Sequence, residues 1–437
     1  MSFSISGIHV PHMKNTANHV PERPAPPKNV VLPVVMHIGK PAVPKVKKGD
    51  YVKVGELIAE QDGAVSSPVY ASVSGTVTKT EDILLSNGTF APAIYIESDG
   101  LMSVYENIVP PVINERADFI KAIKDSGVVG LGGAGFPTYI KLDVKREIEE
   151  LIINGAECEP YITSDTRTMI DDAEEIIYGI SLCEKFLGVK RMVIAIEENK
   201  KKAIEKMREA VKGKDNVSIK VLKSMYPQGA EKVIVYNTTK KVIPAGKLPI
   251  DVGVVVCNCT TMAVIAKYIK TGMPLIEKCV TVDGSAVKEP KNLIVPIGTP
   301  IKYLLDLCGA DEAEIKKVLY GGPMMGITVP NLDAPILKNT NAIIAMNEKE
   351  AKRPEPTQCI HCGLCAMHCP VSISPFSIAR AYKKGDAEEL KRLRVDICME
   401  CGCCSYVCPA KRPLVETNKL SKTVLREYNM KNKEEKK

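Results

Sequence analysis

The sequence predicts a multidomain α/β protein, with a layered α/β domain in its middle, a β-rich domain before it and two smaller domains after it. Three observations predict this class. The chain has 437 residues, which is more than one hydrophobic core usually serves. Its middle part alternates apolar, strand-like runs with amphipathic helical ones. Nine of its 15 cysteines fall between residues 359 and 408, which indicates a separate metal-binding domain.

The first part of the chain is poor in helical signals. Residues 1–28 carry five prolines and little periodicity, which predicts an extended arm. Residues 29–114 contain short Val-rich runs between glycine turns, and the matching runs "KKGDYVKVGELIAE" and "SPVYASVSGTV" predict a barrel-sandwich domain of the biotinyl or lipoyl type. A carrier domain would need a lysine at a hairpin tip, but the turn "AVSSPVYASVSG" has none. We therefore expect a structural role for this domain.

The middle of the chain predicts parallel strands covered by helices. In residues 115–272, "RADFIKAIKDSG" has helical spacing, whereas "ELIING", "KRMVIAIEE" and "DVGVVVCN" predict buried strands that precede helices. Residues 273–346 mix strand-like runs with a helix, which predicts a small β-grasp-like domain. A charged linker at 347–357 leads to the cysteine-rich domain at 358–416, and the tail at 417–437 predicts a frayed helix or disorder.

The cysteine-rich domain contains one motif twice. "CIHCGLCAMHCP" and "CMECGCCSYVCP" each follow C-x2-C-x2-C-x3-C-P, the pattern of bacterial two-cluster ferredoxins. In this pattern three close thiolates hold one 4Fe-4S cluster, and the fourth cysteine, before proline, ligates the other. The predicted ligands of the first cluster are Cys359, Cys362, Cys365 and Cys408. Those of the second cluster are Cys369, Cys398, Cys401 and Cys404.

Other residues near this motif have less specific explanations. Paired C-x2-C motifs also occur in zinc ribbons, but eight ligands in a doubled pattern favour iron-sulfur clusters. Cys403 fits no ligand position, so we expect it to pack. His361 and His368 are expected to form hydrogen bonds or lie at the surface. The cysteines outside the motif share no spacing, which is typical of small buried side chains, although Cys158 lies between two glutamates.

A glycine-rich stretch opens the α/β domain. "GVVGLGGAGFPTYIKL" places Gly130, Gly132 and Gly135 in the spacing G-x-G-x-x-G of dinucleotide-binding loops. That fingerprint requires a strand before the glycines, and here a predicted helix precedes them. The stretch can still present backbone amides to a phosphate, with Pro137 beginning the next helix. A simple turn between two helices is the alternative.

Three further junctions between strands and helices carry polar residues, which is where ligands bind in α/β sheets. They are "INGAECEPYITSD", "YPQGAEKVIV" and "VCNCTTM". Together with the glycine loop, these motifs closely resemble those of the flavin-bearing, NADH-binding subunit of respiratory complex I. With the "MHIGKPA" barrel and the double ferredoxin motif, nearly the whole chain is similar to the RnfC family, whose members are subunits of the Rnf complex. The segments "GTPI" and "YGGPMMG" resemble the SLBB domain of these proteins.

The resemblance implies a cleft in which FMN and NADH stack, with two 4Fe-4S clusters as further cofactors. The glycine loop would line the cleft with Gly130, Gly132, Gly133, Ala134 and Gly135, Phe136 would lie along the nicotinamide or adenine, and Lys141 would neutralise phosphate. The residues expected to hold the flavin are Asn154, Glu157, Tyr226, Gly229, Asn258 and Thr261, and Glu159 would face the dinucleotide. Ala230 stands where the complex I pattern has an acid, so the flavin contacts there do not transfer.

The function implied is electron transfer between NAD(H) and a membrane complex that couples ferredoxin oxidation to ion transport. Its partners would be the other Rnf subunits, both membrane and ferredoxin-like, with ferredoxin contacted indirectly. A microcompartment-type cobalamin reductase and a non-catalytic electron-carrier or scaffold subunit are the alternatives. The net charge of +7 is scattered rather than gathered with aromatics, so we expect no nucleic-acid partner. Without a spanning segment or secretory signal, we expect the protein at the cytoplasmic face of the membrane, bound peripherally.

Overall fold

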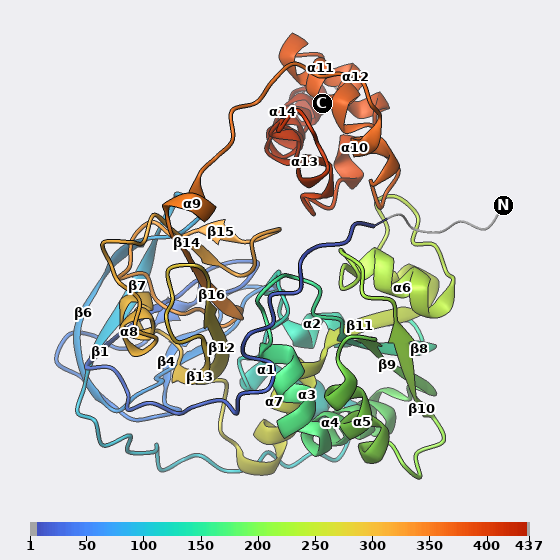
Figure 1. The fold of residues 1–437 in the computed structure, drawn as a ribbon. Coiled ribbons are helices and arrows are strands. Elements are labelled where there is room, and N and C mark those ends of the chain that lie inside the picture. Colours follow the sequence, from blue (N-terminus) through green and yellow to red (C-terminus); the bar gives the residue numbers. More distant parts are fainter. Residues whose placement is uncertain (1–6, 435–437) are drawn as a thin grey trace.

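The computed structural model describes residues 7–434. Two β-rich domains and one α/β domain form a body, and the cysteine-rich domain sits on top of it (Figure 1). The fold class predicted from the sequence is confirmed, because each of the four expected kinds of domain is present.

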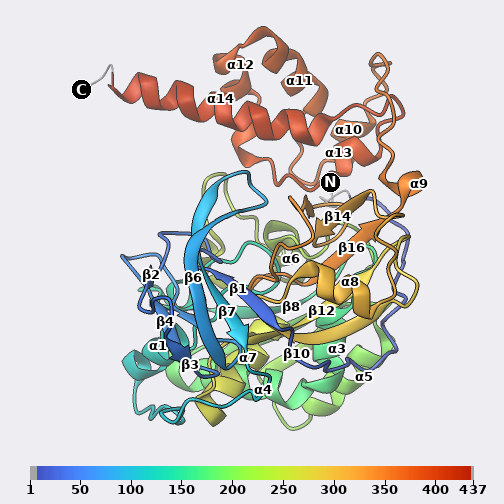
Figure 2. The ribbon, with the colours of Figure 1, turned by 90° about the vertical axis from the view of Figure 1, so that its left-hand side faces the viewer.

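The barrel-sandwich domain has two antiparallel sheets. The larger follows the order β1-β7-β6-β3 and the smaller the order β2-β4-β5. Their bounds are β1 Asn29–Pro33, β2 Val43–Pro44, β3 Tyr51–Val52, β4 Leu57–Glu60, β5 Val69–Tyr70, β6 Gly75–Leu84 and β7 Phe90–Ser98. Side chains that alternate along these strands, such as Val30, Leu32, Ile94 and Ile96, are fully buried between the sheets. The β6–β7 hairpin is the long ribbon at the front of Figure 2.

The α/β domain contains a four-stranded parallel sheet in the order β10-β9-β8-β11. Its strands are β8 Glu150–Gly155, β9 Arg191–Glu197, β10 Val217–Leu222 and β11 Val254–Asn258. The helices are α1 Arg116–Asp125, α2 Thr138–Leu142, α3 Ser164–Asp171, α4 Ala173–Leu187, α5 Lys201–Ala210, α6 Glu231–Thr239 and α7 Cys259–Thr271. Helices on both faces bury the Ile- and Val-rich strands, as the unbroken apolar runs predict.

The third domain packs one helix against a five-stranded sheet in the order β13-β12-β16-β14-β15. Its elements are β12 Glu277–Asp283, β13 Lys291–Pro296, α8 Ile301–Leu307, β14 Lys317–Tyr320, β15 Ile327–Thr328 and β16 Ala342–Met346. Ile301, Leu304 and Leu305 of α8 are buried in one cluster with Val280 and Val282 of the inner strand β12. This helix-on-sheet arrangement confirms the predicted β-grasp-like domain.

The cysteine-rich domain is helical and follows α9 Glu348–Ala351 of the linker. It contains α10 Leu364–Met367, α11 Pro375–Lys384, α12 Ala387–Arg392, α13 Cys403–Tyr406 and α14 Leu414–Glu434. Of the two outcomes expected for the tail, a frayed helix or disorder, the described residues up to 434 form a helix, α14, which lies across the domain (Figure 2). Leu414, Ser421 and Leu425 on its inner face are buried, whereas Glu416, Lys419, Arg426 and Glu427 are exposed.

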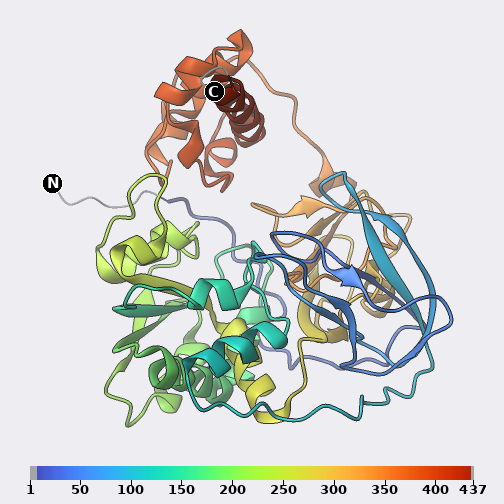
Figure 3. The same ribbon diagram turned by 180° about the vertical axis from the view of Figure 1, so that it is seen from behind.

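The N-terminal arm joins the domains. Ile8 pairs with Tyr226 of the α/β domain, and Glu22 pairs with Leu293 of the third domain. The arm passes between the two halves of the body (Figure 1, Figure 3). No helix in the described part of the chain is both long and apolar enough to cross a membrane.

Candidate functional site

The glycine loop connects α1 to α2, so a helix precedes it, as the sequence predicts. Gly132, Gly133 and Ala134 are exposed at its tip. Within residues 7–434 no acceptor pairs with the backbone amides of these three residues. The stretch therefore presents unpaired N–H groups to solvent, which is how backbone loops bind phosphate.

The loop lies at the carboxyl ends of two neighbouring strands. The amide of Leu131 donates to Oγ1 of Thr261 at 3.1 Å. A Cβ atom at Gly132 would come within 2.7 Å of Nδ2 of Asn258, so the loop touches that side chain. Asn258 of β11 is the register partner of Asn154 of β8.

Asn154 in turn contacts the junction "YPQGAEKVIV", because its Nδ2 donates to the carbonyl of Gly229 at 2.9 Å. The structure thus brings together the glycine loop and all three further junctions that the sequence predicts, over one edge of the sheet.

Neighbouring domains fix the conformation of the glycine loop. From the third domain, Lys338 donates to the carbonyl of Gly127 at 2.8 Å, and Asn339 donates to that of Gly133 at 2.7 Å. Lys278 donates to the carbonyl of Leu131 at 3.2 Å. From the barrel-sandwich domain, the amide of Ile38 donates to the carbonyl of Gly135 at 3.1 Å. The loop is therefore held largely through its carbonyls, and among the described residues the amides of Gly132, Gly133 and Ala134 stay unpaired.

Lys338 is fully buried, and burial lowers its pKa to about 7. Because its pKa is higher in the unfolded chain, the folded state binds this proton less tightly. The loss of folding free energy caused by burying this charged lysine is therefore fully present below pH 7. It disappears as the pH rises toward 10.5. We expect the free energy of unfolding of the unchanged protein to rise with pH over this range relative to that of Lys338→Met. The rise should be at most about 1.4 kcal/mol per pH unit. Denaturant unfolding between pH 6.5 and 9.5 measures it, and a difference that does not vary with pH would contradict the buried-lysine assignment.

Two glutamates follow β8, the buried Glu157 and the half-buried Glu159. Glu157 accepts hydrogen bonds from the amides of Asp165 and Thr166 at 2.8 and 3.3 Å, so it caps the start of α3. Glu159 accepts from the amides of Met324 and Met325 at 3.0 and 2.8 Å, which ties the α/β domain to the third domain. Burial raises the pKa of Glu159 to about 7. Both carboxylates are already hydrogen-bonded within the protein, and their contacts with flavin and dinucleotide stay predictions.

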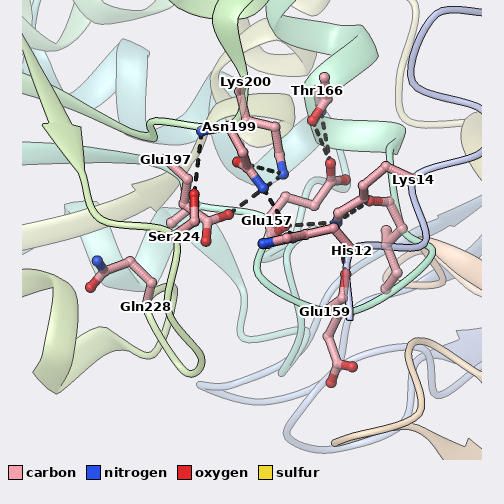
Figure 4. Close-up of polar contacts among 12 residues, drawn as sticks. His12, Lys14, Glu157, Glu159, Thr166, Glu197, Asn199, Lys200, Ser224 and Gln228 are labelled. Carbon is pink, nitrogen blue, oxygen red and sulfur yellow. Dashed lines mark hydrogen bonds and ion pairs between the residues drawn. The ribbon is translucent and has the colours of Figure 1, made fainter. Parts of the chain in front are cut away.

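Lys14 of the arm lies against the loop after β8 (Figure 4). Its Nζ donates to the carbonyls of Glu157, Glu159 and Ile162 at 2.9, 2.7 and 2.6 Å. Burial lowers the pKa of Lys14, whereas burial raises that of Glu157. The arm thus supplies a buried cation to the loop after β8. Sequence reasoning missed this residue, because a lone lysine in an aperiodic arm carries no signal.

Two other predicted residues have partners in the fold. Lys141 forms an ion pair with Glu231 at 2.9 Å and donates to the carbonyl of Val256 at 3.1 Å. Glu231 follows Ala230, so an acid does lie near the position where the resemblance expects one. The half-buried Phe136 accepts a hydrogen bond from the amide of Gly130 through its carbonyl, at 2.8 Å. If Lys141 also bound a phosphate, its ammonium group would interact with the phosphate and with the carboxylate of Glu231 at once.

The eight motif cysteines surround two separate cavities. The first is lined by Cys359, Cys362, Cys365 and Cys408. The second is lined by Cys369, Cys398, Cys401 and Cys404. These are the crossed sets that the motif predicts, each with three cysteines from one run and one from the other. In the described part of the chain, no three potential ligands converge as they would around a single metal ion. The thiol sets fit two 4Fe-4S clusters, and we call their positions cluster 1 and cluster 2 in that order.

Cluster 2 faces the α/β domain. The hydroxyl of Tyr226 donates to the carbonyl of Cys401 at 2.7 Å, and Tyr226 is 1% exposed. Cys403 is also buried here, with its thiol 4.0 Å from the carbonyl of Tyr226. The hydroxyl of Tyr226, expected to hold flavin, is thus engaged with a cluster ligand, because the cysteine-rich domain packs on this junction. The sequence motif predicts Cys401 as a ligand, but its place beside Tyr226 could not be predicted from the sequence.

The histidines of the first motif lie outside the ligand sets. Nδ1 of His368 is 3.1 Å from the carbonyl of Gly7, and His361 packs edge-on against Phe376.

Tyr226→Phe removes the hydrogen bond to Cys401 and keeps the ring. We expect a loss of about 1 kcal/mol in the docking of the cysteine-rich domain, with both clusters still assembled. Rapid-mixing absorbance should then show slower cluster reduction by NADH, with unchanged NADH oxidation by a flavin-reactive dye. Tyr320→Phe, which removes a buried hydroxyl bonded to Pro335, is the control. Equal cluster reduction rates in both variants would contradict a role for this contact.

Comparison with known proteins agrees with the fold. Four family models match in order: the RnfC barrel sandwich hybrid domain at residues 2–101, the Nuo51 FMN-binding domain at 123–267, the SLBB domain at 279–328 and the 4Fe-4S dicluster domain at 355–412. The C subunit of the Na(+)-translocating ferredoxin:NAD(+) oxidoreductase complex of Acetobacterium woodii is 40% identical over 95% of both chains. The chain belongs to the RnfC family of ion-translocating ferredoxin:NAD(+) oxidoreductase subunits.

Other members of the RnfC family agree. The C subunit of the proton-translocating ferredoxin:NAD(+) oxidoreductase complex of Clostridium ljungdahlii is 39% identical over 88% of this chain and 85% of its own. The C subunit of the ion-translocating oxidoreductase complex of Rhodobacter capsulatus is 39% identical over 98% of this chain and 84% of its own. Among solved structures, the NAD+-reducing [NiFe]-hydrogenase in the air-oxidized state matches with a TM-score of 0.52 at 15% identity, covering 71% of this chain and 61% of that one. This last likeness shows the fold alone.

Proposed function

We propose that the protein is the NAD(H)-binding, peripheral subunit of an ion-translocating ferredoxin:NAD(+) oxidoreductase complex. It would exchange electrons between NAD(H) and the membrane subunits through FMN and two 4Fe-4S clusters. The Acetobacterium and Clostridium relatives support this role, since both are C subunits of such complexes. The absence of a membrane-crossing helix from the described residues agrees with peripheral attachment, and we propose the cytoplasmic face because NADH is found there.

The single observation that carries the proposal is the contact between Tyr226 and Cys401. Tyr226 belongs to the same junction as Gly229, whose carbonyl accepts a hydrogen bond from Asn154 at the edge of the sheet, so this contact joins that junction to the second cysteine set. When bound, FMN would take a hydride from NADH and release the electrons one at a time. The chain's own residues would position this exchange: Asn154, Asn258 and Thr261 at the strand ends, and the free amides of the glycine loop toward phosphate.

The protein reconstituted anaerobically with FMN, iron and sulfide should reduce a one-electron dye with NADH, and protein without FMN should not. A scaffold subunit would show no NADH-dependent dye reduction in either form. A cobalamin reductase would reduce added cob(III)alamin at rates matching the dye and would purify without membrane subunits. Co-purification of the tagged chain with membrane subunits from its host, together with FMN-dependent dye reduction, is the result that the proposal predicts.

A further inference from the structure

The two cysteine sets lie in different polar environments. Nδ2 of Asn418 donates to Sγ of Cys398 at 3.5 Å, and the backbone amide of Glu400 lies 3.4 Å from the same sulfur. Lys422, one turn further along α14, donates to the carbonyl of Cys398 and to Oε1 of Glu400, both at 2.7 Å. Helix α14 therefore brings an amide donor and a cation to one ligand of cluster 2.

The amide of Asn418 has no other use in the described residues. Asn418 is 1% exposed and lines the cavity of cluster 2. Its Oδ1 has no hydrogen-bond partner within residues 7–434, so the contact with Cys398 is the one polar interaction that holds this buried side chain. Burying a polar group without strong pairing costs free energy of folding. A buried asparagine whose hydrogen bond goes to Sγ of Cys398 therefore indicates a role for this contact at cluster 2.

Cluster 1 has different polar surroundings, although Arg412 and Leu414, the first residue of α14, line its cavity. In the described part of the chain, no side-chain N–H donates to Cys359, Cys362, Cys365 or Cys408. Its cavity is also closer to solvent, because Cys362 is exposed, whereas three of the four cluster 2 cysteines are buried. The doubled motif therefore holds two sites of the same ligand type in different surroundings.

Reduction adds one negative charge to a 4Fe-4S cluster. Burial in a poor dielectric opposes that charge, whereas N–H donors to the sulfurs and a nearby cation favour it. We propose that helix α14, through Asn418 and Lys422, raises the midpoint potential of the buried cluster 2 and so keeps it able to accept an electron. This inference requires that the protein binds two 4Fe-4S clusters, as in the proposed function, but it does not require that the protein oxidises NADH.

Asn418→Leu keeps the size of the side chain and removes the donor. In the full-length, cluster-loaded protein, titrated with dithionite and mediators and followed by EPR, we expect the ratio of reduced to oxidised cluster 2 at a fixed potential to fall roughly three- to tenfold, where tenfold is 59 mV for one electron. Cluster 1 should not shift, and its signal is assigned as the one lost in Cys362→Ala. Ser421→Ala is the control, because this buried hydroxyl on α14 contacts only the carbonyl of Thr417.

A second pair of variants keeps the test decisive if Asn418→Leu fails to hold cluster 2. Lys422→Gln should lower the cluster 2 potential, whereas Glu400→Gln should raise it, since each leaves one partner of the ion pair uncompensated. Opposite shifts of cluster 2 alone would support the proposal. Unchanged potentials in the assembled variants, or equal shifts of both clusters, would overturn it. Because the reductant is chemical, a failure of NADH oxidation leaves this result unaffected.

Discussion

Replacing Gly133 with valine is expected to abolish NADH oxidation while both clusters remain assembled. A Cβ atom at Gly133 would meet no protein atom within 4 Å, so the new side chain would project into the open space in front of the unpaired amides. It would occupy the place where the proposed phosphate lies and would push the cofactor away. We expect a loss of roughly 100-fold or more in the rate of NADH-dependent dye reduction, with reduced FMN retention. Iron and sulfide content should equal that of the unchanged protein.

Gly88→Val is the matched control. Gly88 also has open space around its missing side chain and a φ of 82°, but it lies in the exposed β6–β7 turn. Gly132→Val would be a poorer choice for the test, because its side chain would collide with Asn258 and disturb the protein's own packing. Normal NADH oxidation by the Gly133→Val protein would contradict the assignment of this loop to cofactor binding.

Alanine variants of the motif cysteines are expected to reveal the crossed ligand sets through iron content alone. Because Cys408 lines the cavity of cluster 1, the double variant Cys359→Ala/Cys408→Ala should lose one cluster and keep about half of the iron. Cys398→Ala/Cys408→Ala, with both changes in the second motif, should lose nearly all of it, since each cluster then lacks a ligand.

Cys403→Ala controls for loss of a thiol from the same motif, and we expect it to keep both clusters. Its thiol lies near the carbonyl of Tyr226. If the double variant within the second motif kept half of the iron instead, each motif would hold its own cluster and the crossed arrangement would be wrong.

Much of this architecture could be predicted because its signals are local. The apolar runs at β8, β9 and β11 and the helix before the glycine loop follow from periodicity, and the cluster ligands follow from spacing fixed by thiolate geometry. What could not be predicted depends on distant packing. Lys338 and Asn339 reach the glycine loop from more than 200 residues away, and isolated polar residues in irregular segments have no sequence pattern.

The tail shows a different limit. Its many charges predict a frayed helix or disorder, and they do not show that spaced residues such as Leu414 and Leu425 bury one face of α14 on the cysteine-rich domain. Composition averages over all faces of a helix and so hides a narrow buried face. Tyr226 likewise fitted a flavin role by position in its motif, but its hydroxyl is used by the domain packed above it.

Transfer of electrons from NADH to the clusters of the same chain can be followed by titrating the anaerobically reconstituted protein with NADH and recording EPR spectra at each step. We expect NADH to produce a reduced 4Fe-4S signal when FMN is present and none when FMN is omitted. A protein that oxidises NADH with FMN bound while both clusters, reducible by dithionite, stay oxidised would show that the electrons do not pass to the chain's own clusters.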